Sequence, residues 1–279
     1  LLTVTSIIIA SLISPTYCAY FQFANTLARI PLMLPNSIGT TILPAIASAK
    51  ATKNDDLLDQ YISESYRYIL IIIIPVCIGI ALLSKQIIGT IQPYKLEYMH
   101  GATTLSILVV GMGFYTIFSI SSSIIQGIKN PRIPMYLLFL GAIFNVILTY
   151  ILVPRYGIEG AGIGTTITSI MITIPCVIIL LKVKKHKNSI LPYLKMLTAS
   201  SVMGICLLGL TSQTFIPLYL QTIIGLLLGI IVYFSVLLIL KGFIRRDVQL
   251  LKRFNNKIKL LSPFFNKIYN LMIKFSSDE

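Results

Sequence analysis

Charged residues are scarce in this sequence of 279 residues: they make up 11% of it, whereas 56% of it is hydrophobic. A soluble domain usually carries about 25% charged residues, and its core needs less apolar surface than this chain has. Acidic residues are scarcest, with nine Asp and Glu against 23 Lys and Arg, which gives a net charge of +14. The composition excludes disordered and collagen-like chains and favours an integral membrane protein.

The sequence also lacks the motifs of common catalytic and metal sites. Its four cysteines stand singly in apolar runs without CxxC spacing, which argues against a zinc site, a redox motif or a disulfide scaffold. No GxSxG, P-loop or HExxH motif occurs. His100 follows Glu97 by three residues, a weak candidate pair that a solvated loop explains equally well. We therefore expect no enzyme, no cofactor and no bound metal.

Long apolar runs fill most of the chain. A bilayer core about 30 Å thick needs roughly 20 apolar residues of helix. Seven runs meet this length and an eighth, at the start, is partial. They predict an all-α integral membrane protein with about eight transmembrane helices: 1–13 (partial), 17–49, 61–83, 102–127, 133–153, 160–181, 192–211 and 217–240. Because the first run starts abruptly and without Met, we expect the sequence to be a piece of a longer protein.

The basic residues are distributed unequally between the two sides of the predicted membrane. Nineteen of the 23 Lys and Arg lie in or beside the turns after the second, fourth and sixth runs, or after the eighth. Only Lys85, Lys95 and Arg155 lie on the other side. Positive charge marks the cytoplasmic side, so we expect a multi-pass protein of the cell (plasma) membrane with its C-terminus in the cytoplasm. This distribution explains the charge without a nucleic-acid partner.

One basic residue, Arg29, remains inside the run 17–49. An arginine at a helix centre costs about 2.5–3.5 kcal/mol on insertion scales and usually faces a partner or a watery cavity. At about 100° per residue, Gln22, Asn25 and Asn36 fall on the same helix face as Arg29, within roughly 60°. Prolines in this run can kink the helix, which weakens the argument for the part of the stripe beyond Arg29.

The run 102–127 carries a second polar stripe, in which four residues again fall within about 60°: Tyr115, Ser119, Ser122 and Gln126. We interpret the two stripes as walls of one hydrated cavity that binds substrate. For the second stripe, hydrogen bonding between helices is an equally good interpretation. No Asp or Glu lies in the interior of a span, so Arg29 has no carboxylate partner there. An isolated guanidinium suits an anionic substrate such as a phosphate.

Small residues indicate close helix packing near the predicted outer turn between the fifth and sixth long runs. Gly160, Gly164 and Thr168 repeat every four residues, a spacing that lets two helix backbones approach closely. Asn145, in the run before that turn, is expected to form a packing hydrogen bond.

Several segments resemble the C-terminal half of polysaccharide (oligosaccharidyl-lipid) flippases of the multidrug/oligosaccharidyl-lipid/polysaccharide exporter superfamily. They are GIKNPR at 127–132, Asn145, LVPRYGIEGA at 152–161, the stretch 20–49 with Arg29, and the outer stretch 89–105. The resemblance implies that residues 1–182 form the C-terminal six-helix lobe with a truncated first helix. It implies two additional transmembrane helices at 183–241 and an N-terminal partner lobe that this sequence does not contain.

In that family two lobes work by alternating access, and cavity arginines of related flippases engage a lipid-linked pyrophosphate. The resemblance thus implies export of lipid-linked oligosaccharide or polysaccharide precursors, with Arg29 binding the phosphate of a polyprenyl-phosphate-linked glycan. Two alternatives stay open. One is a cation-coupled multidrug or metabolite exporter of the same superfamily. The other is a membrane glycan polymerase or ligase, which is less favoured because the longest outer segment, 84–101, holds only two lysines, one acid and one histidine for such chemistry.

The tail 242–279 alternates apolar residues at steps of three and four, with basic residues beside that seam and a net charge of +5. This pattern predicts an amphipathic helix on the surface of an anionic membrane. A coiled coil with a partner is the alternative, although Pro263 interrupts the seam.

Overall fold

The computed structural model describes residues 2–128, 131–183, 191–213 and 215–242, and every regular element within them is helical. The all-α prediction is confirmed. Five helical segments among these residues are long and apolar enough to cross a membrane, those of α4, α6, α7, α8 and α9. In order, the α-helices are α1 (Leu2–Leu12), α2 (Pro15–Ala28), α3 (Met33–Ala51), α4 (Asp55–Leu82), α5 (Ser84–Ile91), α6 (Gly101–Gly127), α7 (Arg132–Val183), α8 (Leu191–Thr211) and α9 (Leu218–Ile239).

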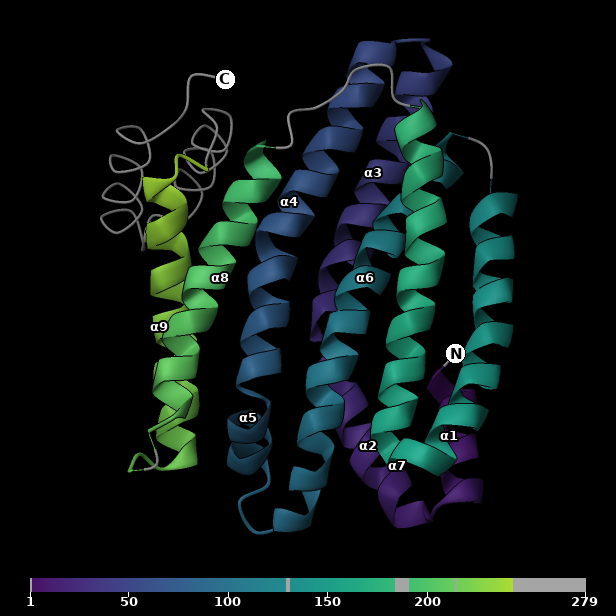
Figure 1. The fold of residues 1–279 in the computed structure, drawn as a ribbon. Coiled ribbons are helices and arrows are strands. Elements are labelled where there is room, and N and C mark those ends of the chain that lie inside the picture. Colours follow the sequence, from purple (N-terminus) through teal and green to yellow (C-terminus); the bar gives the residue numbers. More distant parts are fainter. Residues whose placement is uncertain (1, 129–130, 184–190, 214, 243–279) are drawn as a thin grey trace.

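The helix α7 is 52 residues long and contains both predicted runs 133–153 and 160–181. Its backbone leaves helical geometry at Gly157, which has φ 60° and ψ −141°. Glycine reaches this region without the Cβ clash that other residues meet, so the chain can reverse there. The two halves of α7 then run side by side in opposite directions (Figure 1).

The run 17–49 is not the single helix that the sequence predicted. Two helices replace it, α2 and α3, joined by the short 3-10 helix η1 (Ile30–Leu32). Pro31 has no N–H to donate to the carbonyl of Leu27, so the α-helical ladder is interrupted. The chain tightens instead, and the N–H of Leu32 donates to the carbonyl of Arg29 at 2.9 Å. Arg29 therefore lies at a helix break, and the prediction of a mid-helix position is wrong.

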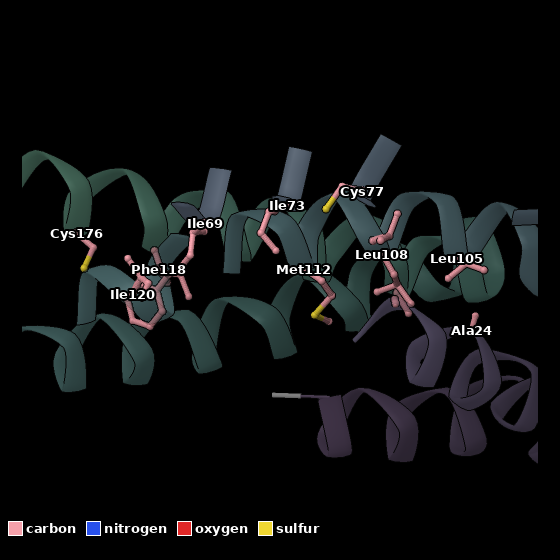
Figure 2. Packing of buried hydrophobic residues seen from close by; sticks show 14 of the residues in the cluster. Ala24, Ile69, Ile73, Cys77, Leu105, Leu108, Met112, Phe118, Ile120 and Cys176 are labelled. Atoms are coloured by element: carbon pink, nitrogen blue, oxygen red, sulfur yellow. The ribbon is translucent and has the colours of Figure 1, made fainter. Parts of the chain in front are cut away.

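The helix α6 forms the centre of the bundle, because α2, α3, α4 and α7 all pack against it. Its side chains Leu105, Leu108, Phe118 and Ile120 are fully or almost fully buried. Figure 2 shows them and Met112 of α6 with neighbours from three other helices: Ala24 of α2, Ile69, Ile73 and Cys77 of α4, and Cys176 of α7.

The small residues of α7 pack as the sequence predicted. A Cβ added at Gly160 would lie 2.4 Å from the carbonyl oxygen of Leu152 on the opposite half of α7. The Asn145 amide donates to Thr165 Oγ1 at 3.4 Å and accepts from Thr5 Oγ1 of α1 at 2.9 Å. Asn145 thus makes the expected packing hydrogen bonds, and these join α1 to both halves of α7.

The helices α8 and α9 pair with each other beside α4, on one side of the bundle (Figure 1). At one end of this pair the amide of Gln86 on α5 donates to Gln221 Oε1 on α9 at 3.2 Å, and the hydroxyls of Thr90 and Thr222 lie 2.8 Å apart. The two helices form a second hydrophobic cluster with α4. Polar contacts therefore reinforce an apolar interface.

Successive connections between the long helices lie at opposite ends of the bundle, as a chain of membrane spans requires. The turn at 52–54 and the end of α9 lie at one end of the bundle, whereas the loop at 92–95 and the turn at Gly157 lie at the other (Figure 1). The second end also holds α5 and the 3-10 helix η2 (Leu96–His100), in a stretch that the sequence predicted as an outer loop. The predicted amphipathic tail lies outside the described residues apart from Gly242.

Candidate substrate-binding face

Arg29 is the C-cap residue of α2 and leads directly into η1. Its N–H donates to the carbonyl of Asn25 at 3.2 Å, which completes the last turn of α2. The residue is exposed, so the break presents a guanidinium at the surface of the bundle rather than inside a continuous apolar helix.

Tyr115 lies on α6, close enough to Arg29 for the phenol and the guanidinium to interact electrostatically. Both α2 and η1 pack against α6, and this packing brings the two predicted stripes together. The Tyr115 ring also contacts the Phe118 ring, with centroids 5.8 Å apart, so packing restricts the position of the phenol. Arg29 and Tyr115 thus lie on elements that pack against each other, and their membership of one site stays a prediction.

Asn25 is one helical turn before Arg29 and is only 2% exposed. Its Oδ1 atom has no hydrogen-bond partner among the described residues. A buried acceptor left without a donor costs about 1–3 kcal/mol. The structure thus leaves an unsatisfied acceptor one helical turn before the exposed Arg29.

Gln22 is exposed, and its amide donates to Ser6 Oγ of α1 at 2.6 Å. It therefore joins two helices, which is one of the roles that polar side chains commonly have in membrane proteins. Asn36 belongs to the first turns of α3, and its side chain lies outside what the structure describes.

The lower members of the α6 stripe bond within their own helix. The amide of Gln126 donates to Ser122 Oγ at 2.9 Å, and the carbonyl of Ser119 accepts from Ser123 Oγ at 3.1 Å. Ser122 is buried, whereas Gln126 is exposed. Neither bond joins two helices, so they support neither hydrogen bonding between helices nor a ligand site, and the role of this stripe stays a prediction.

The exposed faces of the bundle differ in chemistry. The exposed side chains of α2, η1 and α3 are mixed: the polar Thr26, Arg29, Thr40, Thr41 and Ser48 stand alongside the apolar Ile30, Met33 and Leu43. By contrast, α7 to α9 expose large apolar side chains, among them Phe139, Ile143, Ile147, Leu181, Leu227 and Ile231. The apolar faces suit lipid, and the more polar face that contains Arg29 suits water or a second protein lobe.

Arg67 is buried in the structure. From the sequence we expected this cation at the cytoplasmic end of a span. It is 9% exposed on α4, and its Nη2 donates to the carbonyl of Gly242 at 3.2 Å. The sequence offered one sign of this burial, because Arg67 lies six residues inside the apolar run 61–83. Within the described residues no three His, Cys, Asp or Glu side chains converge as a metal site would require.

An all-helical, multi-pass membrane protein with a cation at a helix break has the features of a transporter lobe, since transporters commonly build their sites at discontinuous helices. Comparison with known proteins gives the family. The family model described as lipid II flippase MurJ matches residues 1–233, and the chain belongs to this family.

Two curated relatives and one solved structure illustrate the likeness. The lipid II flippase MurJ of Bacillus subtilis is 28% identical over 149 residues, which cover 52% of this chain and 27% of that protein. The probable low-salt glycan biosynthesis flippase Agl15 of Haloferax volcanii is 21% identical over 83% of this chain and 49% of its own length. A structure of lipid II flippase MurJ in an inward closed conformation aligns with a TM-score of 0.72 and 24% identity over 84% of this chain and 49% of that one. The fold is shared, and the chain spans half or less of each of these proteins.

Proposed function

We propose that this chain forms one lobe of a flippase that moves lipid-linked oligosaccharide or polysaccharide precursors across the plasma membrane by alternating access. The observation that carries the proposal is the exposed Arg29 at the break between α2 and α3, on elements that pack against the α6 helix of Tyr115. Membership of the MurJ family and the flippase names of its relatives support the same class of substrate.

The chemistry of the site suits the phosphate end of such a substrate. A guanidinium can bind two phosphate oxygens in a bidentate way. The Tyr115 hydroxyl can donate a further hydrogen bond, and Asn25, one turn before Arg29, is the third member of the proposed site. No Asp or Glu precedes Asp55 in the sequence, so α1 to α3 contain no carboxylate to compete for Arg29.

During transport each part of the substrate stays in the solvent in which its free energy is lowest. The glycan stays in water along the polar face, while the polyprenyl chain stays in the bilayer. A second lobe supplies the opposite wall, and rocking of the two lobes exposes the site to each side in turn. The site binds and releases its substrate without changing a covalent bond, with the C-terminus on the cytoplasmic side.

The test uses the full-length protein in cells that depend on it for glycan export. Arg29→Ala should abolish export while the protein is still made and inserted. Arg29→Lys should keep partial export, because it retains the charge but loses bidentate geometry. Arg155→Ala is the matched control, since Arg155 is also exposed but lies near the kink of α7. Normal export by Arg29→Ala would refute the proposal, and loss of drug resistance instead of export would favour a multidrug exporter.

A further inference from the structure

An apolar groove with a volume of about 400 Å³ lies between α4, α6 and α8. Its walls include Ile74 and Cys77 of α4, Val110 and Ile117 of α6, and Leu197 of α8. No lining residue carries a charge, an amide or a hydroxyl group. Ile73 and Cys77, which Figure 2 shows close to Met112, belong to the same wall.

The groove and the Arg29 site lie on opposite faces of α6. Counted from Tyr115 at about 100° per residue, the groove residues of α6 fall between roughly 160° and 260°. Ser119, Ser122 and Gln126 fall within about 40° of Tyr115 on the same count. The groove is therefore separate from the proposed substrate site and does not depend on the proposed function.

The groove is open and elongated. Val110 is 42% exposed and Leu197 is 49% exposed, so its rim faces the surroundings of the protein. Along α4 it extends from Leu70 to Leu82, which is about 18 Å of helix at 1.5 Å per residue. The helix α4 is one of those long enough to cross a membrane. An occupant must therefore be a flexible apolar chain within the bilayer.

One end of the groove is positively charged. Arg67 precedes Leu70 by three residues on α4, and Lys195 precedes Leu197 by two on α8. Arg67 Nη2 donates to the carbonyl of Gly242 at 3.2 Å, and Lys195 Nζ donates to the carbonyl of Lys241 at 3.0 Å. Because these carbonyls belong to adjacent residues, the two cations lie near each other at this end of the groove. This end suits a negatively charged head group.

We propose that the groove binds one acyl chain of an anionic phospholipid, with the lipid phosphate at Arg67 and Lys195. The lipid joins α8 to α4 and α6. The chain's own segment 243–279 is a poor occupant, because its net charge of +5 would be repelled by the cations at the end of the groove. A polyprenyl chain is a poor occupant too, because the groove lies on the opposite face of α6 from Arg29.

Native mass spectrometry of the full-length protein, titrated with phosphatidylglycerol and with phosphatidylcholine of the same chain length, tests the proposal. The wild type should bind one phosphatidylglycerol in preference to phosphatidylcholine. Val110→Trp fills the groove and should lower this affinity tenfold or more, whereas Val146→Trp, on the 37% exposed Val146 of α7, should not. Lys195→Gln should lower it about fivefold, as expected for the loss of about 1 kcal/mol per charge. Lys182→Gln, at an exposed lysine of α7, should leave it unchanged.

Three results would overturn the proposal. The first is equal binding of the two phospholipids by the wild type, which requires no variant to fold. The second is equal retention of phosphatidylglycerol by the two tryptophan variants. The third is displacement of the bound phospholipid by polyprenyl phosphate at equal concentration, which would assign the groove to the transported substrate instead.

Discussion

The hydroxyl group of Tyr233 on α9 donates a hydrogen bond of 2.7 Å to the carbonyl oxygen of Ile71 on α4. This carbonyl is special within α4, because the residue four positions later is Pro75, which has no N–H to donate. A proline inside a membrane helix is tolerated where a neighbouring group satisfies the freed carbonyl. Tyr233 fulfils that need and fixes α9 against α4 at the same point.

The Tyr233 bond can be tested with a double-mutant cycle. Tyr233→Phe should lower the free energy of unfolding by about 1 kcal/mol, because the Ile71 carbonyl loses its donor. In a Pro75→Ala background the restored N–H can reach that carbonyl, so Tyr233→Phe should then cost clearly less. Thermal unfolding in detergent measures all four proteins. Equal costs in the two backgrounds would show that the proline is unrelated to the bond.

Asn25 and Asn145 are both almost fully buried, yet they should respond oppositely to replacement by Leu. Asn145 has both its hydrogen bonds, to Thr5 and Thr165, so Asn145→Leu should lower stability by roughly 1–2 kcal/mol. Asn25 Oδ1 has no partner among the described residues, so Asn25→Leu should leave the unfolding temperature unchanged or raised while it reduces glycan export. A large loss of stability in Asn25→Leu would mean that Asn25 is a packing residue.

The contact at Gly160 predicts a strong steric effect. A Cβ at this position would meet the backbone of Leu152 at 2.4 Å, and backbone atoms cannot move aside cheaply. Gly160→Ala should therefore lower stability by about 1–3 kcal/mol. Gly209 of α8 has nothing within 4 Å of its added Cβ, so Gly209→Ala should be neutral or stabilising by up to about 1 kcal/mol. Equal effects of the two substitutions would exclude close packing at Gly160.

A substitution at Gly157 tests the cost of backbone strain rather than the cost of a steric clash. Nothing lies within 4 Å of its added Cβ, but its φ is +60°. Gly157→Ala should cost roughly 1–3 kcal/mol from conformational strain alone. Gly79→Ala, equally free of contacts within the helix α4, is the control and should not destabilise. Circular dichroism during thermal unfolding compares the two, and a harmless Gly157→Ala would mean that the reversal of α7 does not need glycine.

Hydrophobic runs predicted most of the helices because a membrane span needs a length that few other structures require. The bounds of α6, α8 and α9 agree with the predicted runs within one residue. The packing at Gly160 and Asn145 was also predictable, since small residues and lone amides in apolar helices have few other uses.

Three features could not be read from the runs. The break at Arg29 depends on whether neighbouring helices support a kink at Pro31. Counting 100° per residue along a single helix cannot include those neighbours. The helix α5 is too short and too polar to stand out from a loop. The burial of Arg67 depends on where α9 ends, because the carbonyl of Gly242 is its acceptor, and the two residues are 175 positions apart.

The helix α6 meets two opposed environments along its length, a polar one at Tyr115 and an apolar one at Val110 and Ile117. A rotation of this helix by half a turn would carry the phenol into the apolar groove and the aliphatic side chains to the side of α2 and η1. The different chemistry of these two sides therefore adds to the packing of α2, α3, α4 and α7 in fixing the rotation of α6 about its own axis. Any motion of the lobe must carry α6 along without spinning it, and insertion of one residue before Tyr115 should be more damaging than most substitutions within it.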